Sequence, residues 1–288
     1  MEGLKIAIPN KGRMSDDIFE LLNRAGLNFP AKSERTLSVK THDGKYEIIF
    51  VRTRDIPGFV HTGACDVGFT GQDIVNESML DVENLLKLDF GECTMIVAAK
   101  EEDNYNSVKD LPNGVRVATS FPNVANKYFS ENDIKADIAK VEGATEIMPR
   151  MGLVDVIVDI TSSGSTLKAN KLKIIGKIFE SSAVIIGSPN ISSTKKDEIN
   201  SFIRAIHSAL DAKNKKYLMA HIPKTALDEV KSFLPGLSSP TVTTLHGNDK
   251  DVVMHVVVDK NKVYESIDKL KALGASGILI LTVDQMIS

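Results

Sequence analysis

The chain has 288 residues, 42% of them hydrophobic and 25% charged, an ordinary globular composition that excludes a mostly disordered chain, a collagen and a disulfide-stapled miniprotein. The net charge of −3 gives no footprint for nucleic-acid binding, so we expect no nucleic acid as a partner, although a single cleft can still attract anions. No stretch approaches the roughly 20 apolar residues of a membrane helix and no signal peptide is recognised, so we expect no membrane partner and a cytoplasmic protein.

Short β-branched runs alternate with amphipathic helical stretches in the first part of the chain. Strands are predicted over Leu4–Ile8, Tyr46–Val51, Asp66–Thr70 and Thr94–Ala99. A helix is predicted after each of the first three strands, and Ser15 is expected to cap the first of these helices. This alternation favours a mostly parallel α/β architecture.

A second round of the same alternation follows. Strands are predicted over residues 115–119, 136–141, 154–160 and 182–187, and helices over residues 126–131, 145–151 and 195–212. Residues 63–68 and residues 152–157 are similar to each other, and both end a helix and enter a strand. We therefore expect a core over residues 1–212 with two similarly wired lobes around a cleft, lobe I over about 1–93 plus 180–212 and lobe II over about 94–179.

The polar stretch Asp211–Lys216 marks a boundary, after which the pattern changes. Strands are predicted over residues 217–222, 241–245, 252–258 and 277–283, with helices over residues 226–233 and 264–273. The order βαββαβ is that of a ferredoxin-like unit, which we assign to residues 213–288.

The most informative stretch for chemistry runs from Asp155 to Thr166. A buried strand delivers hydroxyl side chains and Gly164 to its carboxyl end, where open α/β sheets bind ligands. Gly164 permits a backbone conformation in which N–H groups converge, so the loop suits a phosphate monoester, with Asp159 beside it for sugar hydroxyls or a divalent ion. The alternative is a polar surface turn. Asp155 is ambiguous, because it and Asp66 hold equivalent places in the two similar segments and both can satisfy backbone amides.

A second candidate is the turn Pro9–Arg13, which follows the first predicted strand. Lys11 and Arg13 can neutralise a polyphosphate there, although the same residues also suit a basic surface turn that binds no ligand. Arg52 and Arg54 follow another strand and lie two residues apart, so they share a face that points to the same cleft. Asp73 begins a helix and is either a ligand or a plain cap.

Cys65 and Cys93 show no metal-binding spacing, and we expect two buried reduced thiols. The histidines form no metal-ligand spacing either, and no GxSxG motif supports Ser-His-Asp catalysis.

Several motifs occur together in the order found in one enzyme family. The chain resembles the ATP phosphoribosyltransferases, the entry enzymes of histidine biosynthesis, in the segments Leu4–Arg13, Asp55–Pro57, Asp66–Gly71, Glu146–Arg150 and Asp159–Leu167. Its C-terminal part resembles the regulatory domain of the long form, in the segments Leu234–Gly236, Ser239–Thr241, Met254–His255 and Lys269–Ala275. Gln72 stands where the family often has another polar or basic residue.

The resemblance implies an activity that the residues alone do not name. N1 of the ATP adenine attacks C1 of 5-phosphoribosyl 1-pyrophosphate and expels pyrophosphate, with Mg²⁺ required. It also implies a periplasmic-binding-protein-like, two-lobed catalytic core, a homo-oligomer such as a hexamer, and inhibition by histidine.

Site residues follow by carrying the family's motifs onto this sequence. For catalysis we expect Lys11, Arg13 and Asp159. For the phosphoribosyl substrate we expect Asp155, Asp159, Thr161, Ser162, Ser163, Gly164, Ser165 and Thr166. For ATP we expect Lys11, Gly12, Arg13, Arg52, Asp73 and Glu146, and for histidine His221, Ser239, Thr241 and Ala275.

Two other readings compete with the enzyme. The repeated lobe wiring also suits a solute-binding protein, against which the missing signal sequence argues. The βαββαβ tail also suits a purely regulatory amino-acid sensor, whose function would be lost on deletion of the residues after about Ala212.

Overall fold

The computed structural model describes residues 3–30, 36–191 and 193–287, and the side chains of Arg13, Ser193 and Thr194 lie outside what it describes. Residue contacts divide the chain into two compact units. Unit 1 comprises Met1–Phe19 and Asn28–Asn200, and unit 2 comprises Glu20–Leu27 and Ser201–Ser288. None of the helices in the described ranges is long and apolar enough to cross a membrane.

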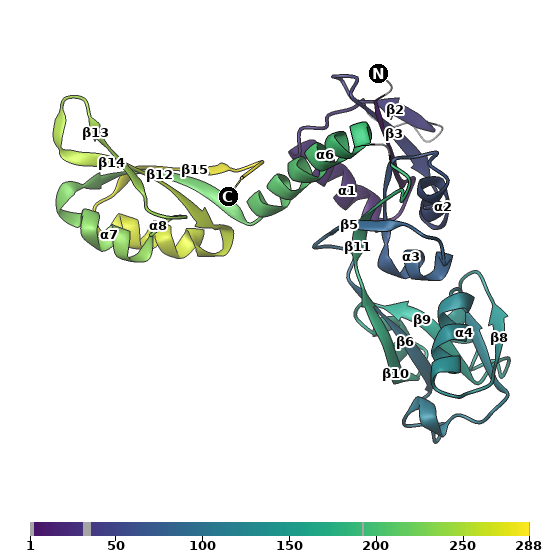
Figure 1. The fold of residues 1–288 in the computed structure, drawn as a ribbon. Helices are drawn as coiled ribbons and strands as arrows, with labels where there is room; N and C mark the ends of the chain where they lie inside the picture. Colours follow the sequence, from purple (N-terminus) through teal and green to yellow (C-terminus); the bar gives the residue numbers. More distant parts are fainter. Residues whose placement is uncertain (1–2, 31–35, 192, 288) are drawn as a thin grey trace. The chain divides into compact units, whose positions relative to one another are not determined.

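Two helices contribute residues to both units. Helix α1 spans Arg13–Arg24 and helix α6 spans Ser193–Ala212. The remaining elements each belong to one unit (Figure 1).

Unit 1 contains two sheets, and we name the part built on each sheet a lobe. Lobe I has a six-stranded sheet in the order β2-β3-β1-β4-β11-β5. Its strands are β1 (Leu4–Pro9), β2 (Ser38–Lys40), β3 (Tyr46–Val51), β4 (Val67–Gly71), β5 (Glu83–Lys87) and β11 (Ala183–Gly187). Its short helices are η1 (Thr53–Asp55), α2 (Ile56–His61) and α3 (Gln72–Ser78).

Lobe II has a five-stranded sheet in the order β10-β6-β9-β7-β8. Its strands are β6 (Cys93–Lys100), β7 (Val115–Thr119), β8 (Ala136–Lys140), β9 (Val156–Thr161) and β10 (Leu172–Ser181). Its helices are η2 (Val108–Asp110), α4 (Pro122–Glu131), η3 (Thr145–Ile147) and α5 (Ser165–Ala169).

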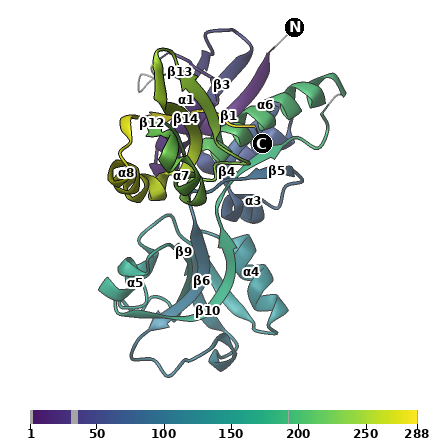
Figure 2. The same ribbon diagram turned by 90° about the vertical axis from the view of Figure 1, so that its left-hand side faces the viewer.

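The chain crosses between the lobes twice. It enters lobe II between β5 and β6 and returns between β10 and β11, and Figure 2 shows β6 and β10 side by side at this crossing. The two strands pair antiparallel, with Cys93 opposite Ser181. We call this two-strand connection between the lobes, at Cys93 and Ser181, the hinge.

The prediction of mostly parallel sheets is wrong in detail. Strand β1 is parallel to β3 and β4, and β7 is parallel to β8 and β9. However, β11 runs antiparallel to both of its neighbours, and so does β6. Both sheets are therefore mixed, because the crossing strands enter each lobe against the direction of the βα units.

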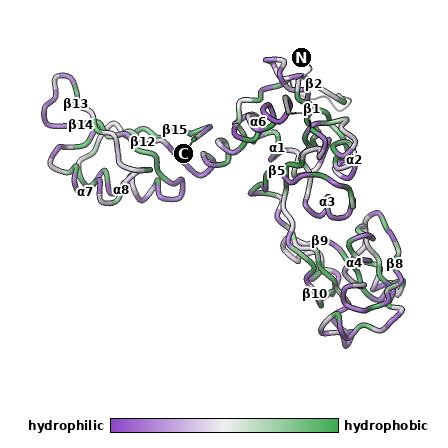
Figure 3. Tube along the Cα trace, in the orientation of Figure 1, coloured by the Kyte–Doolittle hydropathy of each residue, from purple (hydrophilic) through white to green (hydrophobic). Residues whose placement is uncertain are grey.

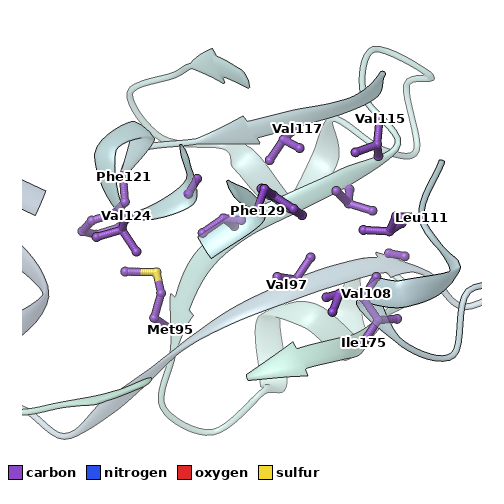
Figure 4. Close-up of a cluster of buried hydrophobic side chains, with 14 residues drawn as sticks. Met95, Val97, Val108, Leu111, Val115, Val117, Phe121, Val124, Phe129 and Ile175 are labelled. Atoms are coloured by element: carbon purple, nitrogen blue, oxygen red, sulfur yellow. The ribbon is translucent and has the colours of Figure 1, made fainter. Parts of the chain in front are cut away.

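Each lobe has its own apolar core. In lobe II, residues of β6, β7 and β9 meet helix α4, as in the cluster of Met95, Val97, Phe121, Val124 and Phe129 (Figure 4). Burial of such side chains is worth about 25 cal/mol per Å² of apolar surface, which is the main source of stability in a lobe this small. Hydrophilic residues gather in the connecting loops, for example at the tip of the β13–β14 hairpin of unit 2 (Figure 3).

Unit 2 carries a four-stranded antiparallel sheet in the order β13-β14-β12-β15. Its strands are β12 (Lys215–Pro223), β13 (Thr241–Leu245), β14 (Asn248–Asp259) and β15 (Ser276–Thr282). Its helices are η4 (Lys224–Ala226), α7 (Leu227–Phe233), η5 (Lys260–Lys262) and α8 (Val263–Ala272). This order and connectivity are those of the predicted ferredoxin-like βαββαβ unit.

Some local predictions need correction. Helix α1 already begins at Arg13, so Ser15 lies inside it, and its hydroxyl donates to the carbonyl of Pro9 at 3.1 Å instead of capping the helix. Strands β2, β5 and β10 and helix α5 were not predicted. Cys65 is buried as expected, whereas Cys93 is only half-buried, and both are free thiols.

Candidate active site

A cleft in unit 1 is bordered by residues of both lobes. It encloses about 510 Å³. Lobe I contributes the end of β1 and the turns after β3 and β4, and lobe II contributes Phe121 and the end of β9. The lining residues include Asn10, Lys11, Met14, Arg52, Thr53, Arg54, Gly71, Asp73, Ile74, Gly91, Cys93, Phe121 and Ile160.

The basic side of the cleft comes from lobe I. Lys11 and Arg52 line the cavity and are exposed to solvent. Gly12 has a φ of +106°, a left-handed conformation that lets the chain turn from β1 into helix α1. Arg13 begins that helix, and its side chain lies outside the described residues. The predicted cluster of cations is therefore represented here by Lys11, Arg52 and Arg54, which all line the cavity.

The hydroxyl loop follows Ile160 of β9, which lines the cleft, although the loop residues themselves are not among its lining residues. Gly164 takes a φ of +71° and stands immediately before helix α5. Its N–H donates to the hydroxyl of Thr161 at 3.0 Å, and the hydroxyls of Ser163 and Ser165 lie 2.9 Å apart. These bonds tie Thr161 to Gly164 and Ser163 to Ser165 within the loop.

Most side chains of this loop are open to solvent. Ser162, Ser163, Ser165 and Thr166 are exposed and Thr161 is half-buried. Ser162 also lines a second, polar cavity of about 270 Å³, together with Thr94 and Ser181. Cys93 lines this cavity as well as the cleft, so the two spaces share a wall at the hinge.

Asp159 is held at the end of β9 by two donors. The hydroxyl of Thr145 donates to its Oδ2 at 2.6 Å, and the N–H of Ile160 donates to its Oδ1 at 2.8 Å. Burial raises the pKa of Asp159, and the nearby negative charge of Glu146 raises it further, against the opposing effects of those two donors and Arg54. The carboxylate is thus oriented but poorly solvated, so it favours a partner that brings protons or positive charge.

Thr145 is a residue that sequence reasoning missed. It is 2% exposed and belongs to η3, which begins after Ala144 in a left-handed conformation with a φ of +53°. Glu146 follows on the same turn and is half-buried. The short helix predicted over residues 145–151 pointed to this turn, but nothing in the letters showed that Thr145 would hold Asp159.

Asp73 lines the cleft but is engaged by the hinge. It is 6% exposed, and its Oδ1 accepts from the hydroxyl of Ser181 at 2.8 Å. Its own N–H donates back to that hydroxyl at 3.0 Å. Asp73 is also not the plain cap of its helix, because Gly71 is the N-cap residue of α3 and the carboxylate of Asp73 bonds to Ser181.

Asp155 lies at the opposite end of β9 from the hydroxyl loop. Its Oδ1 forms an ion pair with Arg116 at 2.7 Å, and its Oδ2 accepts from the Arg116 N–H at 2.9 Å. The hydrogen bonds from Arg116 lower the pKa of Asp155. The expected contact of Asp155 with the phosphoribosyl substrate is not supported, because this carboxylate is committed to the strand edge.

Asp66 repeats the arrangement of Asp155 in lobe I. Its Oδ2 accepts from the N–H of Lys5 at 2.8 Å, and its own N–H donates to the carbonyl of Lys5 at 2.9 Å. Asp155 exchanges the same pair of bonds with Arg116. The structural alternative for both aspartates therefore agrees with the geometry.

The residues proposed for histidine lie in the sheet of unit 2, or next to it. His221 is in β12 opposite Val253, and Thr241 is in β13 opposite His255. Both therefore project from the same face of the sheet. Ser239 is exposed just before β13, whereas Ala275 packs against the apolar core. The structure brings His221 and Thr241 to one face and places Ala275 toward the other.

A further polar pair on this face was not foreseen. The hydroxyl of Tyr217 and Nδ1 of His255 lie 3.0 Å apart. Tyr217 is opposite Val257 in the neighbouring strand, so it projects from the same face as His221.

Comparison with known proteins adds independent information. A family model described as "ATP phosphoribosyltransferase" matches residues 52–208, and one described as "HisG, C-terminal domain" matches residues 212–285. The ATP phosphoribosyltransferase of Methanococcoides burtonii is 42% identical over 284 residues, covering 99% of each chain. That of Methanocaldococcus jannaschii is 38% identical over 288 residues, covering 99% of this chain and all of the relative.

Solved structures agree. A chain of the ATP phosphoribosyl transferase (HisG:HisZ) complex from Thermotoga maritima matches with a TM-score of 0.65 and 29% identity, over 72% of this chain and 98% of that one. The structure of Tv2483 bound to L-arginine matches with a TM-score of 0.50 and 13% identity, over 73% of this chain and 85% of that one, which is a likeness of fold alone. The predicted α/β fold class is confirmed.

The identity of the relatives extends over nearly the whole chain, and both parts of the chain match parts of one family. The chain therefore belongs to the ATP phosphoribosyltransferase family, a family of pentosyltransferases that begin histidine biosynthesis.

Proposed function

We propose that the cleft of unit 1 is where N1 of ATP attacks C1 of 5-phosphoribosyl 1-pyrophosphate and releases pyrophosphate. One observation carries the proposal. The same cavity has Lys11 and Arg52 on one wall and the end of β9, which leads into the hydroxyl loop, on the other. Cations for a pyrophosphate therefore line a cavity whose other wall, at Ile160, leads directly into hydroxyls suited to a phosphate monoester.

The 5′-phosphate is assigned to the loop Thr161–Thr166. Its exposed hydroxyls and the N–H groups around Gly164 can donate to phosphate oxygens, and each such bond to a charged oxygen is worth about 1.5–3 kcal/mol. Asp159, one residue before Ile160 on the same strand, is assigned to the ribose hydroxyls, which can donate to its oriented carboxylate.

Lys11 and Arg52 are assigned to the pyrophosphate of the sugar and to the ATP phosphates. A guanidinium and an ammonium beside the leaving group stabilise the negative charge that grows on a departing pyrophosphate. Adenine N1 is already a nucleophile, so these residues act by positioning and electrostatics without a strong general base. Glu146 stays a weaker assignment to either substrate.

The residues of this site suit Mg²⁺ only if phosphate oxygens of the substrate bind the ion as well. In the described part of the chain, no group of three or more His, Cys, Asp or Glu side chains gathers to hold a metal. Mg²⁺ is commonly bound by one or two carboxylates plus substrate phosphates, and the oriented carboxylate of Asp159 fits that pattern. When bound, Mg²⁺ would neutralise charge on the pyrophosphate.

We also propose that the two parts of the chain have different functions. We assign catalysis to residues 1–212 and regulation by histidine to residues 213–288, with the histidine bound on the sheet face that carries His221 and Thr241. Matches of separate family models to residues 52–208 and 212–285 support this boundary. Assembly into a hexamer and a cytoplasmic location stay predictions.

The test replaces a cation of the cleft. Arg52→Ala should lower kcat/KM for pyrophosphate release by about 10²–10³, the usual cost of removing one charge-stabilising donor. The matched control is Arg204→Ala, which removes an exposed arginine that does not line the cleft and should leave the rate within about twofold. Equal rates for the Arg52 variant and the wild-type protein would remove this cleft from the reaction.

A further inference from the structure

Helix α4 of lobe II begins without a cap of its own. Its N-cap residue is Phe121 and its first helical residue is Pro122, so neither position offers a side-chain oxygen, and proline has no N–H. The N–H of Ala125 donates to the carbonyl of Phe121 at 3.0 Å. The N–H groups of Asn123 and Val124 are then the first-turn donors that need an acceptor.

Glu77 in helix α3 of lobe I supplies that acceptor. Its Oε1 accepts from the N–H of Asn123 at 3.2 Å and its Oε2 from the N–H of Val124 at 3.0 Å. The side-chain amide of Asn123 donates in turn to the carbonyl of Glu77 at 2.9 Å. A carboxylate is well placed at this end of a helix, because the helix dipole is positive there.

Arg54 of lobe I holds the same segment from the cleft side. Its guanidinium donates to the carbonyl of Ser120 at 2.8 Å and lies 5.0 Å from the ring centroid of Phe121. Phe121 is 3% exposed and belongs to the apolar core of lobe II. An acidic and a basic side chain of one lobe thus grip residues 120–124 of the other.

We infer that Glu77 is a positioning residue which, together with Arg54, locks lobe II onto lobe I and sets the width of the cleft. The inference rests on the proposed function only for its consequence for substrate binding. Glu77 is half-buried and does not line the cleft, so it acts through helix α4 and the turn before it.

The lock has a selective consequence for ligands. These contacts favour the arrangement of the lobes in this structure, and the affinity of a ligand that touches both lobes falls as the population of that arrangement falls. 5-Phosphoribosyl 1-pyrophosphate reaches the hydroxyl loop of lobe II and the cations of lobe I, whereas ribose 5-phosphate reaches the loop alone. Weakening the lock should therefore affect the first ligand and spare the second.

The test replaces the carboxylate by an amide. In Glu77→Gln, one oxygen is exchanged for an NH₂ group that faces a backbone N–H. Titration calorimetry should show a loss of about five- to tenfold in affinity for 5-phosphoribosyl 1-pyrophosphate and none for ribose 5-phosphate. The control is Glu131→Gln at the other end of α4, where the carboxylate lies 4.0 Å from Lys127, and it should change neither affinity.

A second measurement needs no substrate. Nitroxides placed on cysteines at the exposed positions Lys40 in lobe I and Lys109 in lobe II, in a Cys93→Ser background, report the distance between the lobes. Glu77→Gln should lengthen or broaden that distance distribution, and Glu77→Asp should give an intermediate result because the charge is kept but the reach is shorter.

The outcomes separate the two proposals. An unchanged distance distribution in the Glu77→Gln variant overturns the lock, and so does an equal loss of affinity for both ligands, which indicates a merely structural role. A wild-type protein that binds neither ligand contradicts the proposed function instead, and the distance measurement then decides on the lock alone.

Discussion

Burial of the Asp159 carboxylate at the candidate active site lowers the stability of the folded protein. Its carboxylate is removed from water, close to Glu146, and its pKa is raised above the ordinary value of 3.8. Between that value and the raised one, the native state binds more protons than the unfolded state, so this group makes stability fall as pH rises through the window. A charge held in this way is poised for a positive or hydrogen-bond-donating partner.

Replacing Asp159 by Asn should accordingly raise stability and remove activity. The amide loses the unfavourable charge, while the hydroxyl of Thr145 can turn to accept from the new NH₂ group. We expect the melting temperature at pH 7 to rise by about 2–4 °C, with the difference shrinking as pH falls toward 4. Melting curves between pH 3 and 8 check this, and a variant less stable than the wild-type protein at pH 7 would contradict it.

At this scale the sequence revealed residue types better than residue partners. Asp159, the hydroxyl loop, Lys11 and Arg52 were proposed as site residues because they stand near or after the carboxyl ends of predicted strands, where α/β sheets bind ligands. The equivalence of Asp155 and Asp66 was visible too, but the ion pair with Arg116 needed the pairing of β7 with β9. Thr145 and Glu77 were missed because their roles depend on contacts with distant residues.

At the scale of elements, helix α4 shows what local signals leave out. The sequence predicted this helix over residues 126–131, whereas it already begins at Pro122, and it lacks the Ser, Thr, Asp or Asn that usually caps a helix. The missing cap was itself a signal that another segment supplies the acceptor. Strands β5 and β10 were missed for a related reason, since their half-exposed sequences become strands only by pairing with β11 and β6.

The turn from β9 into α5 allows a test of backbone conformation. A Cβ at Gly164 would meet no other described atom within 4 Å, so crowding inside the protein is not the obstacle to substitution there. The obstacle is the φ of +71°, because this conformation costs an L-residue about 1–2 kcal/mol. Gly164→Ala should therefore lower stability by about that amount and weaken ribose 5-phosphate binding as the loop relaxes.

The matched control for this substitution is Gly114→Ala. Gly114 also lies in lobe II, with a φ of +84° and no described atom within 4 Å of a built Cβ. The control should lose similar stability and keep its affinity for ribose 5-phosphate, as followed by melting curves and calorimetry. Equal affinities for both variants would show that the conformation of Gly164 is irrelevant to the phosphate.

At the scale of the whole molecule, the amino-acid sequence predicted the order of most strands and helices along the chain. The alternating strands and helices, the two similar segments and the βαββαβ tail all correspond to observed sheets. The mixed direction of the core sheets was not predicted, because it arises from the double crossing of the chain at the hinge. Such long-range pairing leaves little trace in any local stretch of sequence.

The proposed regulation by histidine belongs to this scale, since it is a coupling between a site in unit 2 and a reaction in unit 1. Coupling of this kind is commonly worth 1–3 kcal/mol, or about 5- to 150-fold in affinity. His221→Ala should raise the histidine concentration needed for half-inhibition by at least about fivefold and leave the rate without histidine unchanged. Assays of pyrophosphate release across a histidine series check this, and unaltered inhibition would exclude the His221 face.

The place of β11 in its sheet has a consequence for how the protein is made. This strand lies between β4 and β5, although all of lobe II precedes it in the chain. As the nascent polypeptide leaves the ribosome, the five strands of lobe II are complete at Ser181, before Ala183–Gly187 can join the first sheet. During translation the middle of this polypeptide can thus reach its native structure before its beginning does, the reverse of the usual N-terminal-first order.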